Sequence, residues 1–426
     1  MNIGLFTDTY FPQVSGVATS IKTLRDELIA QGHHVYIFTT TDPQAKHDDI
    51  AAGVYRFPSI PFVSFKERRI AVRGAFVRVK LAKKFQLDIV HNQTEFALGM
   101  MGKLVARELK IPCLHTYHTM YQDYLHYIAN GHIVKPRNVA TFVRLYMKSI
   151  DGVIAPSDRV LDTMHSYNVT SPIRVIPTGV NLRVYQQRDS SAQVHALRQR
   201  YGYTDDTPVL LSLSRLAYEK NINALIAAMP DILAQRPTAQ LLIVGAGPAR
   251  HTLERQVRQL GLTDHVQFAG EVDNSEVYHY YQMADVFVSA SDSESQGLTY
   301  DEALASDLPI VVMRSKYTDE LIDDPAIGVS FQQQSELVHG VLHYLNHPGD
   351  VESHERRQAK LHSISAEVFV QQVVQFYTDC QKELAARQAA KESASFVSLI
   401  REALCLRLQC FHQQIRLLVR GSAVRT

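Results

Sequence analysis

The stretch "NIGLFTDTYFPQVSGVATSIKTLRDELIAQGHHVYIFTT", residues 2–40, decides the fold class. It consists of a short apolar run, a polar loop, a segment with helical periodicity over 17–32 and a second apolar run. Ile21, Leu24 and Leu28 recur at the spacing of one helix face. A strand, a helix and a strand in this order indicate a parallel, doubly wound α/β sheet.

The same alternation continues along the chain and then restarts. Further strands are predicted over 87–93, 111–117, 152–157 and 173–179, and a second series begins with the strand over 208–216. We therefore predict two Rossmann-like domains that face each other across a cleft, where the carboxyl ends of the strands bind ligand. The predicted parts are an N-terminal domain (1–190), a linker (191–206), a C-terminal domain (207–365), a helix returning toward the N-terminal domain (366–390) and a basic amphipathic tail (391–426).

Composition excludes several classes of protein. The 426 residues include 44 basic and 43 acidic ones, and a nucleic-acid-binding protein would carry a positive excess. The four cysteines of the chain form no C-x-x-C pair, so neither a zinc site nor a disulfide framework is indicated. We see no signal peptide and no apolar run of the roughly 20 residues that a spanning helix needs. A cytoplasmic protein is expected.

Two glutamates stand out in "SDSESQGLTYDEALASDLP", residues 291–309. Glu294 falls in the loop that leaves a predicted strand, and Glu302 falls on the helix that follows. Both are expected at the carboxyl end of the second sheet, where a carboxylate can accept hydrogen bonds from hydroxyl groups. On residue types alone, a helix cap and a surface glutamate explain the pair equally well.

Two basic residues favour a site at the same edge. "SRLAYEKN" follows the first strand of the second series and carries Arg215 and Lys220. Such a pair can clamp a diphosphate and stabilise its charge as a bond to it breaks. An ordinary exposed loop is the alternative, but several features converge on one sheet edge.

Other motifs are weak when taken singly. Gly16 precedes the first helix, whose N-terminus could bind a phosphate, but a plain turn explains it better. The same holds for Gly245 and Gly247 after a later strand. His115 and His118 lie three residues apart with no third ligand nearby, so we predict no metal site.

Taken together, the stretches "SRLAYEKN", "LLIVGAGP", "FAGEV" and "SESQGLTYDEALASDLPIVV" resemble the retaining glycosyltransferases of family GT4, which have the GT-B fold. Glu294 and Glu302 match the E-x7-E motif of that family. The resemblance covers nearly the whole chain. Within the family, "HTYHTMYQDYLHY" and "SESQGLTY" are similar to bacterial diacylglycerol glucosyltransferases, which use UDP-glucose.

The resemblance implies a UDP-sugar site and front-face transfer with retention. The C-terminal domain would bind the nucleotide sugar and the N-terminal domain the acceptor, with no metal and no tightly bound cofactor, and with the UDP-sugar as a substrate. The implied contacts are Glu294 and His118 with the donor sugar, Arg215, Lys220 and Gly16 with the diphosphate, Glu302 with the ribose, the backbone of Gln296, Gly297, Leu298 and Thr299 with sugar hydroxyls and phosphate, and the backbone of Val272 with uracil. His118, Glu294, Arg215 and Lys220 would be catalytic. Asp301 stands where an apolar residue is commoner, and we expect its side chain to point away from the ligand.

A basic segment suggests where the acceptor lies. If residues 66–85 form one helix, one face carries basic side chains and an adjacent face carries apolar ones, as in helices that lie on anionic membranes. The basic side chains are Lys66, Arg69, Arg73, Lys80 and Lys84, and the apolar ones are Ile70, Val77, Leu81 and Phe85. The alternative is a solvated face over an ordinary core stripe, and Gly74 could interrupt the helix. The tail shows a similar pattern.

We therefore expect a peripheral enzyme on the cytoplasmic face of the cell membrane. It would transfer glucose from UDP-glucose to 1,2-diacylglycerol. The alternatives are a GT4 transferase with another donor or acceptor, a sugar-nucleotide epimerase of the same fold, and a nucleotide-sugar-binding protein without catalysis.

Overall fold

The chain forms two compact units, Met1–Gln375 and Phe376–Thr426. A computed structural model describes residues 1–13, 15–62, 65–71, 75–121, 136–187, 189–349 and 351–391. In the second unit, the described residues 376–391 are helical. The predicted amphipathic tail therefore lies, apart from residue 391, outside the described residues.

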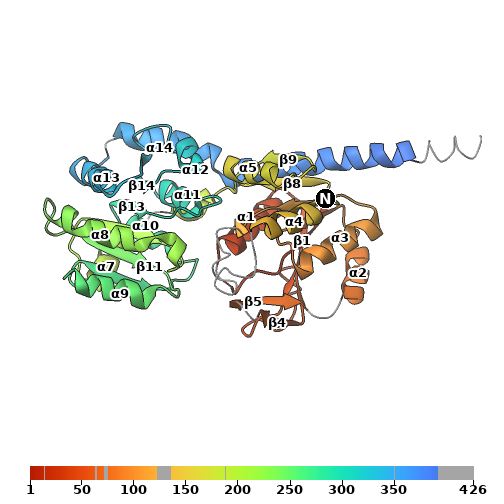
Figure 1. The fold of residues 1–426 in the computed structure, drawn as a ribbon, viewed down its shortest axis with the longest axis horizontal. Helices are drawn as coiled ribbons and strands as arrows, with labels where there is room; N and C mark the ends of the chain where they lie inside the picture. The colour runs from red at the N-terminus through yellow and green to blue at the C-terminus, as the bar shows by residue number, and fades with distance from the viewer. Residues whose placement is uncertain are drawn as a thin grey trace, which may run out of the picture. The chain divides into compact units, whose positions relative to one another are not determined.

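The first sheet has seven parallel strands in the order β3-β2-β1-β6-β7-β8-β9. Figure 1 labels β1, β8 and β9 of this sheet. The strands are β1 (Asn2–Phe6), β2 (His34–Thr40), β3 (Val54–Phe57), β6 (Ile89–Asn92), β7 (Cys113–Thr116), β8 (Gly152–Ala155) and β9 (Ile173–Val175). The helices are α1 (Gly16–Ala30), α2 (Ala75–Lys84), α3 (Ala97–Leu109), α4 (Pro136–Met147) and α5 (Asp158–Ser166). A separate antiparallel pair joins β4 (Ser59–Phe62) to β5 (Phe65–Ala71).

The second sheet has six parallel strands in the order β12-β11-β10-β13-β14-β15. They are β10 (Val209–Leu213), β11 (Gln240–Val244), β12 (Val266–Gly270), β13 (Val286–Ser289), β14 (Ile310–Met313) and β15 (Gly328–Phe331). The other elements are α6 (Leu182–Tyr185), α7 (Ser191–Arg200), η3 (Tyr218–Lys220), α8 (Ile222–Leu233), α9 (Arg250–Gln259), α10 (Val277–Gln282), α11 (Leu298–Ala305), α12 (Lys316–Leu321), α13 (Gln334–Asn346) and α14 (Val351–Ser363). The prediction of two Rossmann-like parallel sheets is confirmed.

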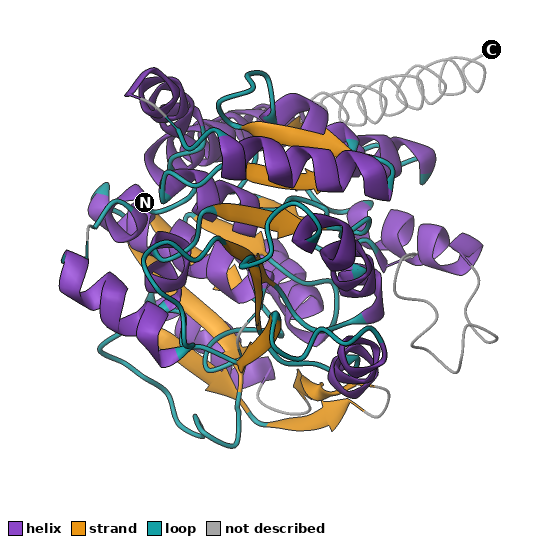
Figure 2. Cartoon of the chain, turned by 90° about the vertical axis from the view of Figure 1, so that its left-hand side faces the viewer, coloured by secondary structure: helices purple, strands orange, loops and turns teal. Residues whose placement is uncertain are grey.

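The apolar runs of the strands form these sheets because both faces are buried. In β10, Leu210 packs into the hydrophobic core on one face of the sheet, while Val209 and Leu211 pack into the core on the opposite face. Helices accordingly flank the strands (Figure 2). Ser15 caps α1 by accepting a hydrogen bond from the amide of Ala18 at 3.2 Å.

The prediction of a single basic helix over 66–85 is wrong. Its first part is strand β5, in which Arg69 donates to both the hydroxyl and the carbonyl of Ser59, each at 2.8 Å. Its second part is α2, after which the ring of Phe85 stacks on Tyr36 at 4.1 Å in the core. Leu81 and Phe85 of the apolar stripe thus pack against the core of the first sheet, while Lys80 and Lys84 are exposed. The side chains of Ile70 and Val77 lie outside the described residues. The side chain of Lys66 and all of Arg73 lie outside the described residues.

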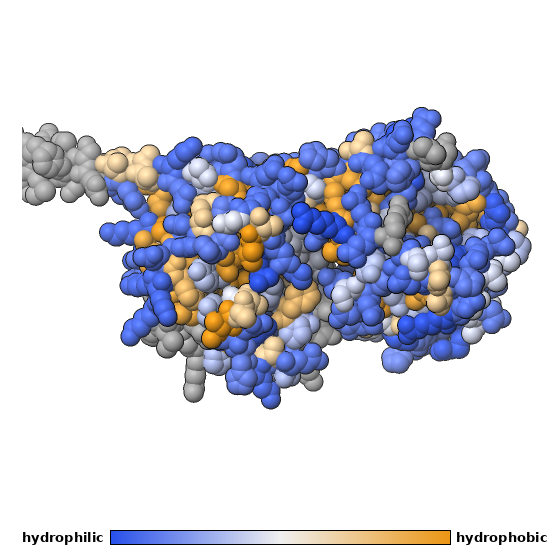
Figure 3. Space-filling model, turned by 180° about the vertical axis from the view of Figure 1, so that it is seen from behind, coloured by the Kyte–Doolittle hydropathy of each residue, from blue (hydrophilic) through white to orange (hydrophobic). Residues whose placement is uncertain are grey.

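The predicted domain boundaries stay predictions, although the proposed linker 191–206 contains α7. Residues 366–391 are helical, as expected for 366–390. Within the described ranges, every helix is too short or too polar to cross a bilayer. The surface mixes polar and apolar side chains in the view of Figure 3.

Candidate active site

The order of the second sheet reverses between β10 and β13, which are neighbours. At such a point the connections diverge and leave a place for ligand at the carboxyl ends of the strands. The loop after β10 carries Arg215 and Lys220, and the loop after β13 carries Glu294. Lys220 Nζ lies 2.6 Å from Glu294 Oε1, and both side chains are mostly buried. The structure thus brings together a predicted diphosphate-binding residue and a predicted sugar-binding residue.

Arg215 is exposed in the same loop, beside a turn that requires glycine. Gly245 has a φ of +133°, and a Cβ there would lie 1.9 Å from the carbonyl oxygen of Ser214. A Cβ at Gly247 would lie 2.3 Å from the carbonyl oxygen of Leu216. The two glycines therefore allow this turn to approach the backbone on both sides of Arg215, in agreement with their interpretation as turn residues.

Glu302 lies on α11 with its carboxyl group buried. The hydroxyl of Tyr281 donates to its Oε2 at 2.7 Å. Burial raises the pKa of Glu302 to about 7, although hydrogen bonds from Tyr281 and Tyr185 favour the ionised form. Near neutral pH this carboxyl can therefore take either protonation state, and only the ionised form accepts hydrogen bonds through both oxygens.

Asp301, the residue that departs from the family pattern, is completely buried. The hydroxyl of Tyr317 lies 2.7 and 2.8 Å from its two oxygens, and Gln296 Nε2 donates to Oδ2 at 3.1 Å. Burial raises the pKa of Asp301 to about 7. Asp301 thus holds the side chain of Gln296, a residue of the predicted donor loop.

Gln296 also binds the backbone that leaves the first sheet. Its Oε1 accepts from the amide of Thr178 at 2.7 Å, and its Nε2 donates to the carbonyl of Thr178 at 2.7 Å. The hydroxyl of Thr178 lies 2.8 Å from that of Ser20 on α1. This clamp ties the donor loop to the first Rossmann-like half, and no pattern in the sequence predicted it.

His118 and Gly16, from the first half, both lie against the donor loop. Ser295 Oγ donates to the carbonyl of His118 at 2.9 Å. A Cβ added to Gly16 would lie 3.8 Å from Leu298 Cδ1, at ordinary contact distance. Of the remaining predicted donor residues, Gly297 precedes α11, Thr299 lies in its first turn, and Val272 is partly buried after β12.

Both histidines are bonded to polar side chains. His118 Nε2 lies 2.8 Å from Gln93 Oε1, and His115 Nε2 lies 3.1 Å from Glu95 Oε1. Burial, together with His115, lowers the pKa of His118 to about 3, so its ring is neutral at physiological pH. Tyr121 donates to the other oxygen of Glu95. Among the described residues, no group of three or more His, Cys, Asp or Glu side chains could hold a metal ion.

Besides Thr178, sequence reasoning missed three further residues near this site. Asp8 and Glu95 are buried acids after β1 and β6, the strands at which the first sheet reverses, and burial raises the pKa of Asp8 to about 6. An acid just after an apolar strand was a usable signal for both. Arg159 on α5 donates to the carbonyls of Asp292 at 3.1 Å and Glu294 at 2.7 Å. No pattern in the sequence around Arg159 indicates these contacts with residues that are distant in the chain.

Comparisons with known proteins agree with this geometry. Residues 14–184 match the family described as Glycosyltransferase Family 4, and residues 194–377 match Glycosyl transferases group 1. The chain is 46% identical to alpha-monoglucosyldiacylglycerol synthase of Streptococcus pneumoniae over 90% of its own length and 88% of that protein. The chain belongs to glycosyltransferase family 4. A protein of the same name from Acholeplasma laidlawii is 35% identical, with 82% of this chain and 89% of that protein covered.

Solved structures support the fold of this glycosyltransferase. Anabaena HepE in complex with UDP-glucose superposes with a TM-score of 0.69 at 16% identity, covering 89% of this chain and 100% of that chain. Sucrose-phosphate synthase from Thermosynechococcus elongatus gives 0.67 at 22% identity, covering 89% of this chain and 98% of that chain. These similarities confirm a GT-B fold.

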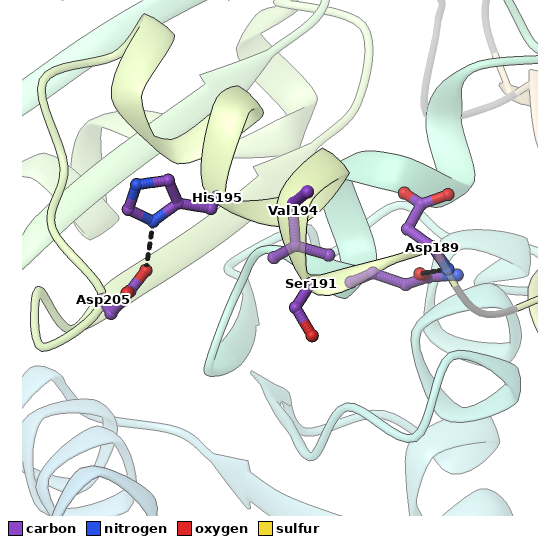
Figure 4. A pocket seen from close by; sticks show the side chains of 7 residues that line it. Asp189, Ser191, Val194, His195 and Asp205 are labelled. Atoms are coloured by element: carbon purple, nitrogen blue, oxygen red, sulfur yellow. Dashed lines mark hydrogen bonds and ion pairs between the residues drawn. The ribbon is translucent and has the colours of Figure 1, made fainter.

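The glycosyltransferase also has a surface pocket of about 560 Å³ away from the predicted site residues. Asp189, Ser191, Val194, His195 and Asp205 line it, together with Ala192 and Gln282. Figure 4 shows His195 pointing toward Asp205, to which it is bonded at 2.8 Å. None of the predicted donor-binding residues lines this pocket.

Proposed function

We propose that this glycosyltransferase transfers glucose from UDP-glucose to the free hydroxyl of 1,2-diacylglycerol, with retention, and forms alpha-monoglucosyldiacylglycerol. The observation that carries the proposal is the 46% identity, over 90% of the chain, to a protein named for this product. The ion pair of Lys220 with Glu294 beside α11 supports it, because a diphosphate and a hexose need a cation and a carboxylate close together.

In the proposed complex, the diphosphate lies against Lys220 and Arg215, and the glucose hydroxyls face Glu294. As the bond from the anomeric carbon to the phosphate oxygen breaks, negative charge grows on UDP, and the two cations stabilise it. The acceptor oxygen attacks from the face that UDP leaves, and its proton passes to the leaving phosphate oxygen. Glu302 accepts the ribose hydroxyls, and the backbone around Val272 meets the uracil.

His118 supports this arrangement through its neutral ring. With Gln93 Oε1 as the acceptor, His118 Nε2 carries the proton. The other nitrogen, Nδ1, then accepts hydrogen bonds and suits a hydroxyl of the donor sugar. A charged imidazolium would offer no acceptor at all.

We further propose that no cofactor is tightly bound and that the UDP-sugar acts as a substrate. The enzyme works on the cytoplasmic face of the cell membrane, because its acceptor is a membrane lipid and its donor is water-soluble. Since Arg215 and Lys220 neutralise the diphosphate, dialysis against a chelator should leave turnover unchanged. A rate that collapses and returns only with a divalent ion would contradict this part.

The test incubates the full chain with a panel of nucleotide sugars and lipid acceptors and identifies products by mass spectrometry and NMR. We expect glucosyldiacylglycerol with an α-anomeric signal from UDP-glucose and diacylglycerol. A different preferred sugar or acceptor would replace the assigned substrates within the family. A free sugar-nucleotide isomer as product would instead identify an epimerase.

A further inference from the structure

Five large apolar side chains are exposed on α3, on α4 and at the residue that precedes α3. Their exposed fractions are 45% for Phe96, 55% for Met100, 41% for Leu104, 44% for Phe142 and 63% for Leu145. Phe96, Met100 and Leu104 follow the four-residue spacing of one helix stripe, and Phe142 and Leu145 share a face of α4. Single exposed apolar residues are normal, but such a group marks an interaction surface. We call these five residues the α3–α4 face.

Contacts at two points show that α3 and α4 lie side by side. The ring of Phe96 stacks on Phe142 at 6.3 Å. Further along, Lys103 Nζ donates to the carbonyl of Tyr146 at 2.6 Å. Met100 lies between Phe96 and Lys103 on α3, and Leu145 precedes Tyr146 on α4. The five apolar side chains therefore belong to one surface.

The charges of the same segments are strongly biased. Residues 97–110 and 136–148 contain one acid, Glu108, and six basic residues, namely Lys103, Arg107, Lys110, Arg137, Arg144 and Lys148. Over the whole chain the two signs balance, at 44 basic and 43 acidic residues. Apart from Lys103, these basic side chains are exposed. Exposed apolar residues with basic neighbours complement the acyl chains and headgroups of an anionic bilayer.

The α3–α4 face also connects to the candidate active site. Phe96 packs against Tyr121, and the Tyr121 hydroxyl donates to Glu95. Glu95 binds His115 on the strand that leads to His118, which contacts the donor loop through Ser295. A lipid anchored on this face would thus have its polar end near the transferred sugar.

We propose that the α3–α4 face docks the enzyme on an anionic lipid bilayer; this rests on the proposed lipid acceptor. It replaces the predicted helix over 66–85 as the apolar part of the membrane contact. Contacts between the basic side chains and the anionic headgroups steer the enzyme to the bilayer surface. Met100, Leu145 and their neighbours enter the acyl region.

The test compares M100S/L145S with a matched control, I50S/L260S, which changes two apolar residues exposed elsewhere. Vesicles of equal parts phosphatidylglycerol and phosphatidylcholine are sedimented with each full-length protein. We expect partitioning of M100S/L145S to fall roughly tenfold or more, and the control to stay near wild type. Circular dichroism melts establish that each variant is folded. Equal sedimentation of wild type and M100S/L145S would overturn the proposal, unless the labelling test below places Leu145 in the acyl region.

A fluorescent label tests the face directly, whatever else in the chain binds lipid. L145C is made in a C405S/C410S background and labelled with an environment-sensitive dye, since Cys113 and Cys380 are buried. Vesicles should shift its emission to the blue, and brominated lipids should quench it, whereas a label on L260C should not respond. Co-sedimentation without any response at Leu145 overturns the proposal.

Activity separates this proposal from the proposed function. M100S/L145S should lose turnover on diacylglycerol in vesicles and keep it on a short-chain diacylglycerol in detergent. If the wild type makes no glucolipid in either format, the proposed function fails. The vesicle and labelling measurements still decide whether the face binds lipid.

Discussion

Lys220 Nζ lies 2.6 Å from Glu294 Oε1, although 74 residues separate them in the chain. The pair exists because β10 and β13 are neighbours at the reversal of the second sheet. When no UDP-glucose is bound, the positive charge of Lys220 and the negative charge of Glu294 neutralise each other. A diphosphate would compete with Glu294 for Lys220, so the pair holds the cation in position before UDP-glucose arrives.

Replacing Lys220 with Ala should lower kcat by roughly 10²–10³, since one lost charge-stabilising donor typically costs about 2.7–4 kcal/mol. Initial rates with UDP-glucose and diacylglycerol measure this. Lys316→Ala is the matched control, because Lys316 also forms a lysine–carboxylate pair, with Asp162 at 2.8 Å, but an exposed one. Similar rates for both variants would remove Lys220 from the diphosphate site.

The two glutamates should separate in steady-state kinetics. Glu302→Gln should raise the KM for UDP-glucose with little change in kcat, because ribose is held equally before and during transfer. Glu294→Gln should lower kcat, because charge develops at the sugar. Each loss should be roughly tenfold to a hundredfold, as for a hydrogen bond to a charged group. The opposite pattern would exchange the two roles.

UDP binding should depend on pH through Glu302. Burial raises the pKa of this carboxyl to about 7, so below that pH the unliganded chain holds a proton there. Ribose hydroxyls favour the ionised acceptor, so UDP must displace the proton. Affinity should rise with pH by up to roughly tenfold per unit and level off above the pKa.

Isothermal titration between about pH 5.5 and 8.5 measures this dependence, and buffers of different ionisation enthalpy reveal the released proton. Glu302→Gln is the comparator, because the phosphate of UDP titrates equally in both proteins. A wild-type profile that matches the variant would show that Glu302 does not change protonation on binding.

Gln296→Glu should destabilise the chain by about 1–3 kcal/mol, because the carbonyl of Thr178 would lose its buried donor. The new carboxylate would also face Asp301, which now accepts from Gln296 at 3.1 Å. Denaturant unfolding measures the change. The exposed Gln259→Glu controls for the added charge. An unchanged midpoint would mean that the Thr178 clamp contributes nothing to stability.

Local patterns predicted much of the fold, because parallel strands buried on both faces are continuous apolar runs. The pattern failed over 66–85, where helical spacing describes α2 but not the residues before it. Strand β5 forms because its backbone pairs with β4. The spacing of side chains along one segment does not reveal such a pairing with another segment. Strand β15 (Gly328–Phe331) was not among the predicted strands.

The candidate site divides in the same way. Glu294, Lys220 and Arg215 were predictable because each follows a strand, and the carboxyl ends of parallel strands share an edge. Arg159 and Thr178 reach the site only through contacts across more than 100 residues of chain. Such contacts depend on how the two halves pack, which no local window contains.

The stacking of Phe85 on Tyr36 has a kinetic consequence. It fixes α2 on the core before any lipid is met, and α2 packs beside α3. Lys80, Lys83 and Lys84 are therefore presented on an already folded helix, and approach to a bilayer involves no loss of chain entropy there. Long-range attraction by these lysines would set how fast the enzyme arrives, as steering charges do elsewhere. The apolar residues of α3 and α4 would set how long it stays, so salt should slow arrival and leave the residence time nearly constant.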